Sequence, residues 1–513
     1  MAKNISFGEP LQLLDVLQLL EDLKCQRWPK IGWTSQAQKK IQKSAEDVRR
    51  LVRSGKSVYG INTGFGSLSD VHIPENDLRQ LQKNILRSHA AGVGEVLPLD
   101  VAATAVFLRV HCLSLGHSGV RMQVLEFFNQ LLSTGHIPEI PSQGSVGACG
   151  DLAPLAHMSL CVLGEGRLFQ GGEYQPAAHV LSQLGLHPLT LEPKEGIALV
   201  NGTQVSTAIL LMAYLKALKL LHASTVIYGM SVDAFEGSAS PFDARVVALR
   251  NHPGVQKVSA YMQTLLRGSE ILKSHEACSR VQDPYSFRCG AQVLGMAMDV
   301  FGFVGQILER EINAVTDNPI LVNGAAISNG NFHGEGVAFA ADFAKISLAE
   351  VGNISERRLA KLLDHRFSPQ VTPFLAKNPG VESGLMMVQV TAASLVSENK
   401  TYAHPQSVDS IPTNLDKEDH VSMSTTAARF FSKVVDHVAH ILACECLAAY
   451  RAISFRRPRK SSPMIEEVLS ELSQFLSHAE GDQIPADELK QITKWLETSK
   501  FLAKHELAFR KNI

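Results

Sequence analysis

The sequence predicts a mainly α-helical protein: a central bundle of long helices, with a region of mixed structure before about residue 200. Two observations predict this class. Apolar residues recur at helical spacing over unusually long stretches, and the alternating pattern of strands is scarce. With 513 residues, 45% of them hydrophobic, the chain is long enough to bury a large core. Long helices of this kind normally pack side by side in a bundle.

The longest helical pattern covers residues 421–453, which contain neither proline nor glycine. Residues 335–363 show the same periodicity despite Gly336 and Gly352. Both stretches exceed the length of an ordinary globular helix. Shorter helical patterns cover residues 100–115, 203–221 and 296–312.

We expect three parts along the chain: an N-terminal domain over residues 1–200, a central long-helix bundle over 201–460, and a C-terminal helical appendage over 461–513. No internal repeat or low-complexity linker interrupts this order. Glycine, proline and polar residues concentrate in five segments, which carry most of the chemically informative side chains: 54–70, 139–151, 279–291, 323–336 and 403–420.

Charge and composition argue against several classes of partner. The 49 Lys and Arg residues nearly balance 50 Asp and Glu residues, and no basic block stands out, so charge gives little support to a nucleic-acid or anionic-membrane partner. The first residues lack the pattern of a signal peptide, and Lys216 and Lys219 interrupt the most apolar helical stretch. Eight scattered cysteines without a framework spacing predict reduced thiols in a cytoplasmic protein.

Several common kinds of site find little support. The glycine-rich stretch YGINTGFG, headed by Tyr59, lacks the spacing and the lysine of a phosphate-binding loop, so no nucleotide is predicted. His437 and His440 lie one helical turn apart without a third ligand at zinc spacing, so no metal is predicted. No G-x-S-x-G elbow appears, and nothing in the sequence orients Cys149 and His157 as a nucleophilic pair.

The stretch GSVGACGDLAPL, residues 144–155, combines small residues with a single thiol just before an apolar helical pattern. A helix is expected from Asp151 onward, since Pro154 is tolerated in a first helical turn. Glycines and alanine around Cys149 allow a backbone fold too tight for bulky side chains.

Seven stretches in this chain resemble the histidine and aromatic amino-acid ammonia-lyases, in the family's order and approximate spacing from Tyr59 to Met423: YGINTGFG, SHAAGVG, GSVGACGDLAPLAH, ALVNGTQ, QDPYSFRC, GNFHGE and EDHVSM. Several such motifs together are far more specific than any one of them. The pattern is most similar to the histidine-specific branch. The resemblance implies a helical bundle of the fumarase/aspartase-like type and a homotetramer whose active sites are shared between subunits.

The resemblance also implies a prosthetic group made from the chain itself. In this family an Ala-Ser-Gly tripeptide closes into a 4-methylidene-imidazol-5-one, and Ala148-Cys149-Gly150 occupies that place here. Cys149 stands where the family usually has serine, and β-elimination from it would expel hydrosulfide, whose parent thiol is a more acidic leaving group than an alcohol. The alternative is a tripeptide that does not cyclise in a catalytically silent homologue.

Further roles follow from the matching positions. Tyr59 would be the base that removes the substrate's β-proton, which requires a phenol pKa well below the usual value of about 10. Arg288 would hold the α-carboxylate through its guanidinium fork. Three residues would line and polarise the electrophile and the amine: Asn201, Gln282 and Tyr285.

Substrate identity depends on the remaining positions. Phe332 would flank the prosthetic ring, and His89 and Glu418 would recognise the substrate ring. A carboxylate suits an imidazole N–H and suits an apolar phenyl ring poorly. Lys417 stands where the family would have glutamine, and it could pair with Glu418. We therefore expect an ammonia-lyase converting L-histidine to trans-urocanate, with a tyrosine or phenylalanine lyase or aminomutase as the alternative.

Overall fold

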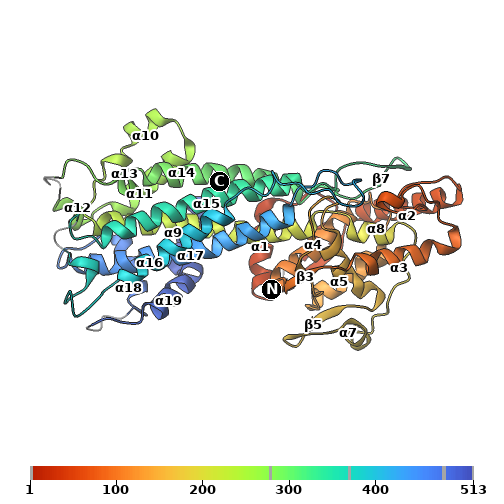
Figure 1. Ribbon diagram of the computed structural model, residues 1–513, viewed down its shortest axis with the longest axis horizontal. Coiled ribbons are helices and arrows are strands. Elements are labelled where there is room, and N and C mark those ends of the chain that lie inside the picture. Colours follow the sequence, from red (N-terminus) through yellow and green to blue (C-terminus); the bar gives the residue numbers. More distant parts are fainter. Residues whose placement is uncertain (1–3, 276–279, 368–370, 477–480, 511–513) are drawn as a thin grey trace. The chain divides into compact units, whose positions relative to one another are not determined.

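The computed structural model describes residues 4–275, 280–367, 371–476 and 481–510. The chain divides into two compact units, each assembled from three separate segments (Figure 1). Unit 1 contains Met1–Ala213, Gly305–Asp342 and Pro405–Arg429, and unit 2 contains Tyr214–Val304, Phe343–His404 and Phe430–Ile513. The division into 1–200, 201–460 and 461–513 stays a prediction.

The mainly α-helical class is confirmed, and four long helices dominate the fold: α9 (Gln204–Ala234), α14 (Gly290–Glu311), α15 (Glu335–Leu362) and α17 (Ser424–Ser454). The predicted patterns at 335–363 and 421–453 match α15 and α17 to within three residues. α9 continues 13 residues beyond the predicted end at 221. The added part includes the polar residues Ser224 and Thr225, which are buried in the structure and donate their hydroxyls to the Leu221 carbonyl oxygen at 2.8 and 3.0 Å.

Within unit 2 the long helices run side by side (Figure 1). Tyr214 of α9 stacks on Phe301 of α14 with ring centroids 5.6 Å apart, and Phe301 lies 6.2 Å from Phe431 of α17. Glu445 of α17 is fully buried there and paired with Arg358 of α15 through two hydrogen bonds of 2.5 and 2.8 Å. Pairing offsets the free-energy cost of burying the two charges in the protein interior.

Shorter helices complete unit 2: α10 (Ala244–Arg250), α11 (Pro253–Leu266), α12 (Glu270–Lys273), α13 (Tyr285–Arg288), α16 (Met386–Tyr402), α18 (Pro463–Leu472), α19 (Pro485–Thr498) and α20 (Lys500–Arg510). The last three lie within residues 461–513. Two described helices, α9 and α14, are long and apolar enough to cross a membrane by length and composition alone. In α9, 83% of the apolar stretch is buried inside the protein, as in a core helix.

Unit 1 contains the expected mixed structure, in which short strands accompany helices. Four two-stranded sheets are present among the described residues: β1 (Asn4–Phe7) with β2 (Lys30–Trp33), which is parallel, and three antiparallel pairs, β3 (Val93–Val96) with β4 (Pro141–Gln143), β5 (Arg167–Gln170) with β6 (Glu173–Pro176), and β7 (Ile320–Val322) with β8 (Ala325–Ile327). The unit's own helices are α1 (Leu13–Lys24), α2 (Ser35–Arg53), α3 (Leu78–His89), α4 (Leu99–Ser114), α5 (Met122–Thr134), α6 (Leu152–Ser159), α7 (Ala177–Gln183) and α8 (Glu195–Val200).

Candidate active site

The tripeptide Ala148-Cys149-Gly150 forms a tight turn in unit 1. Gly150 has a left-handed φ of +67°, and backbone bridges join it to Gly147 and Ala148. A Cβ atom at Gly150 would collide with the carbonyl group of Gly202, so only glycine fits. The tripeptide therefore lies in a tight turn that accepts no side chain at position 150.

Neighbouring segments hold this turn by hydrogen bonds. The carbonyl oxygen of Gly147 accepts bonds from the Gly334 amide at 3.1 Å and the Ser422 hydroxyl at 3.0 Å. The Met423 amide donates to the Val146 carbonyl oxygen at 2.8 Å. The segments that carry Phe332 and Glu418 thus meet at the tripeptide, although they are more than 80 residues apart in sequence.

Asp151, which follows the tripeptide, is a buried carboxylate that sequence reasoning treated only as a helix start. Its oxygens accept bonds from the Ser206 amide at 2.7 Å, the Ser206 hydroxyl at 2.9 Å and the Thr425 hydroxyl at 2.7 Å. Burial raises its pKa, and these donors oppose the rise. The helix expected after Asp151 is α6, with Pro154 in its first turn. Asp151 thereby ties the tripeptide to the first turns of α9 and α17.

The Cys149 thiol lies against a carboxylate. Its Sγ donates to Oε1 of Glu418 at 3.0 Å, and Oε2 of Glu418 accepts a bond of 2.5 Å from the Thr413 hydroxyl. Burial, followed by the charge of Glu418, raises the pKa of the Cys149 thiol. The sulfur is therefore held as a neutral thiol, and no thiolate nucleophile is formed here. His157 accepts from the Gly92 amide at 3.0 Å, and Cys149 bonds to Glu418 instead of to this histidine.

Lys417 could pair with Glu418 by sequence, but no such ion pair is formed among the described residues. Lys417 is exposed, while the half-buried Glu418 carboxylate is occupied by Thr413, Asn414 and Cys149. A long exposed lysine gains little from pairing with a carboxylate that three neighbours already satisfy. The substitution at Lys417 therefore leaves the Glu418 carboxylate facing the tripeptide.

Tyr59 and His89 lie within electrostatic reach of Glu418. Burial is the main cause that raises the pKa of Tyr59, and the charge of Glu418 adds to it. The expectation of a lowered phenol pKa is thus wrong for the uncyclised chain, because desolvation and negative neighbours disfavour the phenolate. Burial lowers the pKa of His89, so its imidazole is neutral at pH 7. A neutral imidazole can donate one hydrogen bond and accept another.

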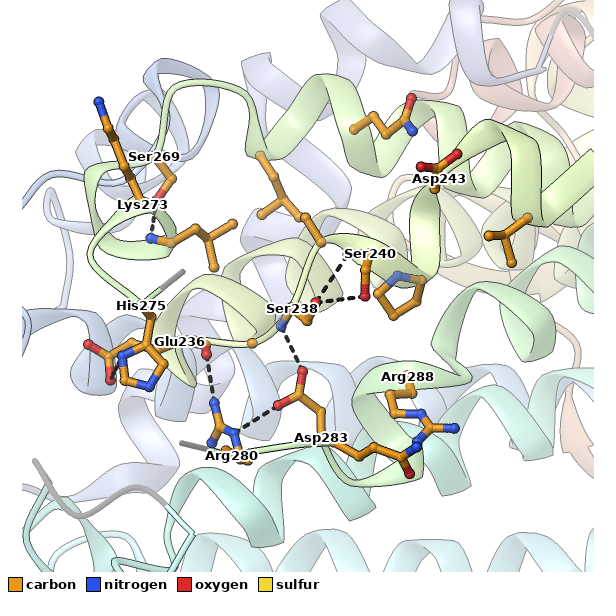
Figure 2. Close-up of a pocket in the computed structure, with 18 of the residues that line it drawn as sticks. Glu236, Ser238, Ser240, Asp243, Ser269, Lys273, His275, Arg280, Asp283 and Arg288 are labelled. Carbon is orange, nitrogen blue, oxygen red and sulfur yellow. Dashed lines mark hydrogen bonds and ion pairs between the residues drawn. The ribbon is translucent and has the colours of Figure 1, made fainter. Parts of the chain in front are cut away.

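Three of the predicted residues lie in unit 2: Gln282, Tyr285 and Arg288. Gln282 and Arg288 line a cavity of about 1200 Å³, which Figure 2 shows with Arg288 at its edge. Tyr285 begins α13 with 72% of its surface exposed, and the Arg288 guanidinium lies 5.3 Å from its ring centroid. Asp283 anchors the segment by accepting from the Ser238 amide at 2.6 Å. Within the described chain no carboxylate forms an ion pair with Arg288.

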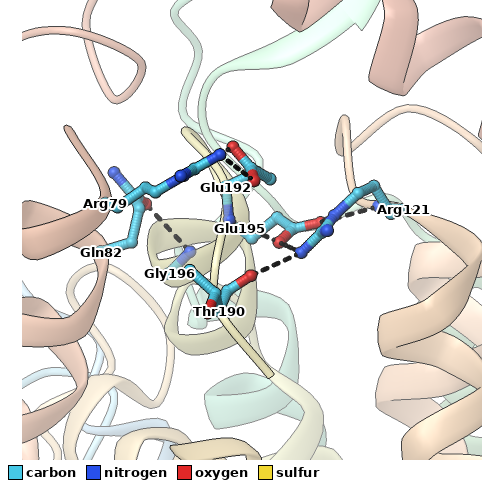
Figure 3. Close-up of polar contacts among 7 residues, drawn as sticks. All are labelled: Arg79, Gln82, Arg121, Thr190, Glu192, Glu195 and Gly196. Carbon is cyan, nitrogen blue, oxygen red and sulfur yellow. Dashed lines mark hydrogen bonds and ion pairs between the residues drawn. The ribbon is translucent and has the colours of Figure 1, made fainter. Parts of the chain in front are cut away.

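Asn201 follows the short helix α8 and donates through Nδ2 to the Cys149 carbonyl oxygen at 3.0 Å. A buried network fixes this helix (Figure 3). Glu195 is fully buried and accepts bonds from the amide, Nε and a terminal nitrogen of Arg121 at 2.7–3.0 Å. The Gly196 amide donates to Gln82 at 2.9 Å. Asn201 is thus held by the packing of α8 against α3 and by the Arg121–Glu195 pair.

Replacing Arg121 with alanine is expected to lower the free energy of unfolding by about 3 kcal/mol, because the buried Glu195 carboxylate loses its side-chain cation. Arg79→Ala is the matched control: it removes an arginine from Glu192, but both partners are substantially exposed, so the loss should stay below about 1 kcal/mol. Denaturant unfolding of the two variants measures the difference. Equal losses would contradict the structural role assigned to the Arg121–Glu195 pair.

The class of enzyme follows from comparison with known families. The sequence model of the aromatic amino acid lyase family matches residues 12–474 of this chain. The chain belongs to that family, and the predicted carbon–nitrogen lyase class is confirmed. Histidine ammonia-lyase from Aromatoleum aromaticum is 45% identical over 91% of this chain and 89% of its own length. The enzyme of the same name from Legionella pneumophila (strain Corby) is 43% identical over 94% and 95%.

Solved structures show the same fold. The crystal structure of histidine ammonia-lyase from Trypanosoma cruzi has a TM-score of 0.90 at 36% identity, covering 99% of this chain and 96% of that one. Tyrosine aminomutase from Streptomyces globisporus also reaches 0.90, at 32% identity and 98% coverage of both chains. Fold similarity alone therefore does not separate the lyase from the aminomutase reaction.

Proposed function

We propose that this chain eliminates ammonia from L-histidine to give trans-urocanate. The observation that carries the proposal is the place of Glu418, whose carboxylate lies 3.0 Å from Sγ of Cys149. That sulfur is the group that ring formation would remove, so its departure frees the carboxylate for another donor. An imidazole N–H is such a donor, whereas a phenyl ring offers none. The relatives named histidine ammonia-lyase support the same substrate.

Ala148, Cys149 and Gly150 form the methylidene-imidazolone in this proposal. The Gly150 nitrogen joins the Ala148 carbonyl carbon with loss of water, and the Cys149 side chain leaves its Cβ as hydrosulfide while the Cα proton departs. The raised thiol pKa favours this step, because a neutral thiol leaves as HS⁻ whereas a thiolate would have to leave as a dianion. When formed, the ring supplies an electrophilic methylene carbon. The bond from Asn201 to the Cys149 carbonyl would polarise it.

The remaining residues bind substrate and move its proton. Tyr59 accepts the β-proton in the proposal. Arg288 is available for the α-carboxylate, and Gln282 and Tyr285 would contact the amine. His89, neutral at pH 7, would hydrogen-bond the substrate ring.

The proposed assembly is a homotetramer in the cytoplasm, with active sites shared between subunits. Unit 2 exposes large apolar side chains on three helices: Met296, Phe303, Phe343, Ile346, Met387 and Val390. Two of them, Phe303 and Phe343, lie edge-on with ring centroids 5.8 Å apart, and exposed apolar side chains that lie together favour a protein interface. Light scattering at micromolar concentration should give the mass of four chains, and a monomer would contradict the proposal.

The substrate assignment is tested by the absorbance of urocanate as purified enzyme acts on histidine, with tyrosine and phenylalanine as competitors. We expect kcat/KM to favour histidine, and Glu418→Gln to lower the histidine value by about 10–100-fold, as for loss of a charge-assisted hydrogen bond. A preference for tyrosine would instead favour the alternative, a tyrosine or phenylalanine lyase or aminomutase, which His89 also permits. No turnover of any of the three substrates would contradict the proposed reaction.

A further inference from the structure

A cluster of three potential metal ligands lies at the edge of the tripeptide site in unit 1. His333 and Glu335 come from the segment that leads into α15, and His420 comes from the segment before α17. One ligand atom from each residue lies within 4.8 Å of the other two. Sequence reasoning missed the group because 87 positions separate the two histidines and no zinc-like spacing links them.

The two imidazoles have the spacing of coordinating ligands. Nε2 of His333 lies 3.4 Å from Nδ1 of His420, and the rings stack at 25° with centroids 5.4 Å apart. A tetrahedral Zn²⁺ with bonds of about 2.0–2.1 Å holds two ring nitrogens about 3.3–3.4 Å apart. At 3.4 Å a direct hydrogen bond between the rings is weak, so this contact alone stabilises the arrangement little.

The carboxylate of Glu335 supplies an independent observation. Its Oε2 is buried, and no described residue donates a hydrogen bond to it. A buried oxygen without a donor is costly and calls for a cation or a proton. The oxygen that lacks a partner thus belongs to the residue that completes the ligand set.

We propose that His333, Glu335 and His420 bind a divalent transition-metal ion, with Zn²⁺ as the probe. Two imidazoles and one carboxylate are a donor set that zinc takes with water in the fourth position, and the exposure of His420 leaves that position open to solvent. The ion would tie residues 329–335 to residues 418–423. These segments carry Phe332 and Glu418, and Gly334 bonds directly to the tripeptide loop. Zinc would therefore stabilise the two segments at the edge of the site.

The test is isothermal titration of Zn²⁺ into chelator-treated full-length protein, in a Cys25→Ser background because Cys25 is an exposed thiol. We expect one equivalent to bind, and His333→Ala and His420→Ala each to weaken binding by about 100-fold or more, since even outer partners of ligands matter by 10–100-fold. His437→Ala is the matched control and should bind normally, because its imidazole bonds to Asn399 outside the cluster. Co²⁺ should give the intense visible absorption of a tetrahedral site.

Thermal melts without metal check that each variant is folded, and the exposed His420 is the substitution least able to disturb the core. Glu335→Gln, which keeps the shape but not the charge, should also weaken binding. The proposal is overturned if the parent protein binds Zn²⁺ with a dissociation constant above about 1 mM, or if the His333 and His420 variants bind as tightly as the control. Binding needs no turnover, so this result is independent of the lyase assignment.

Discussion

Cys149→Ala is expected to lose activity by several orders of magnitude, the largest effect of any single substitution in this chain. Alanine has no leaving group at Cβ, so no exocyclic methylene can form and the electrophile is lost. The variant should still fold, because the turn depends on Gly150 and on the bonds to Gly147 and Asp151. Turnover of histidine by the purified variant is the measurement.

Cys149→Ser is the matched control for this prediction. Serine and cysteine converge on the same methylidene product, so the serine variant should keep activity broadly intact. Near-parental turnover by Cys149→Ala would contradict the account. A thiol at Cys149 that can still be alkylated in fully active enzyme would contradict it as well.

Tyr59→Phe is the second large effect expected. Removing the phenol oxygen removes the base that accepts the β-proton, which should lower kcat by about 10²–10⁴-fold. The ring absorbance should persist, since Tyr59 acts on substrate and makes no hydrogen bond to the tripeptide among the described contacts. Phe65, whose ring lies edge-on 6.5 Å from that of Tyr59, offers a control: Phe65→Leu should have a far smaller effect.

Two results for Tyr59→Phe would contradict the role assigned to Tyr59. If the variant loses the ring absorbance together with activity, Tyr59 belongs to ring formation and not to proton abstraction. If it keeps near-parental kcat, another group removes the proton.

Much of the helical architecture could be predicted from periodicity alone. The patterns that became α15 and α17 are apolar on the faces that pack, and this signal survives Gly336 and Gly352. The end of α9 could not be predicted, because Ser224 and Thr225 are polar in the sequence, and their burial and their bonds to the Leu221 carbonyl oxygen appear only in the structure.

Part of the candidate site could likewise be predicted from the sequence, and part could not. The glycines of the tripeptide loop predict a tight backbone turn. The structure agrees, because only glycine fits at position 150, which has a left-handed conformation and packs on Gly202. The role of Asp151 and the grouping of His333 with His420 could not be predicted, since both depend on segments that are distant in sequence. The raised pKa of Tyr59 also depends on burial, which the sequence does not show.

The most direct test of the central claim is the mass of the proteolytic peptide that spans residues 140–160, taken from active protein. Closure of Ala148-Cys149-Gly150 predicts a peptide lighter than its translated mass by one water and one hydrogen sulfide. The same loss should leave no thiol at Cys149 for an alkylating reagent. An unmodified mass with an intact Ala-Cys-Gly sequence would contradict the account and identify the chain as a family member without the electrophile.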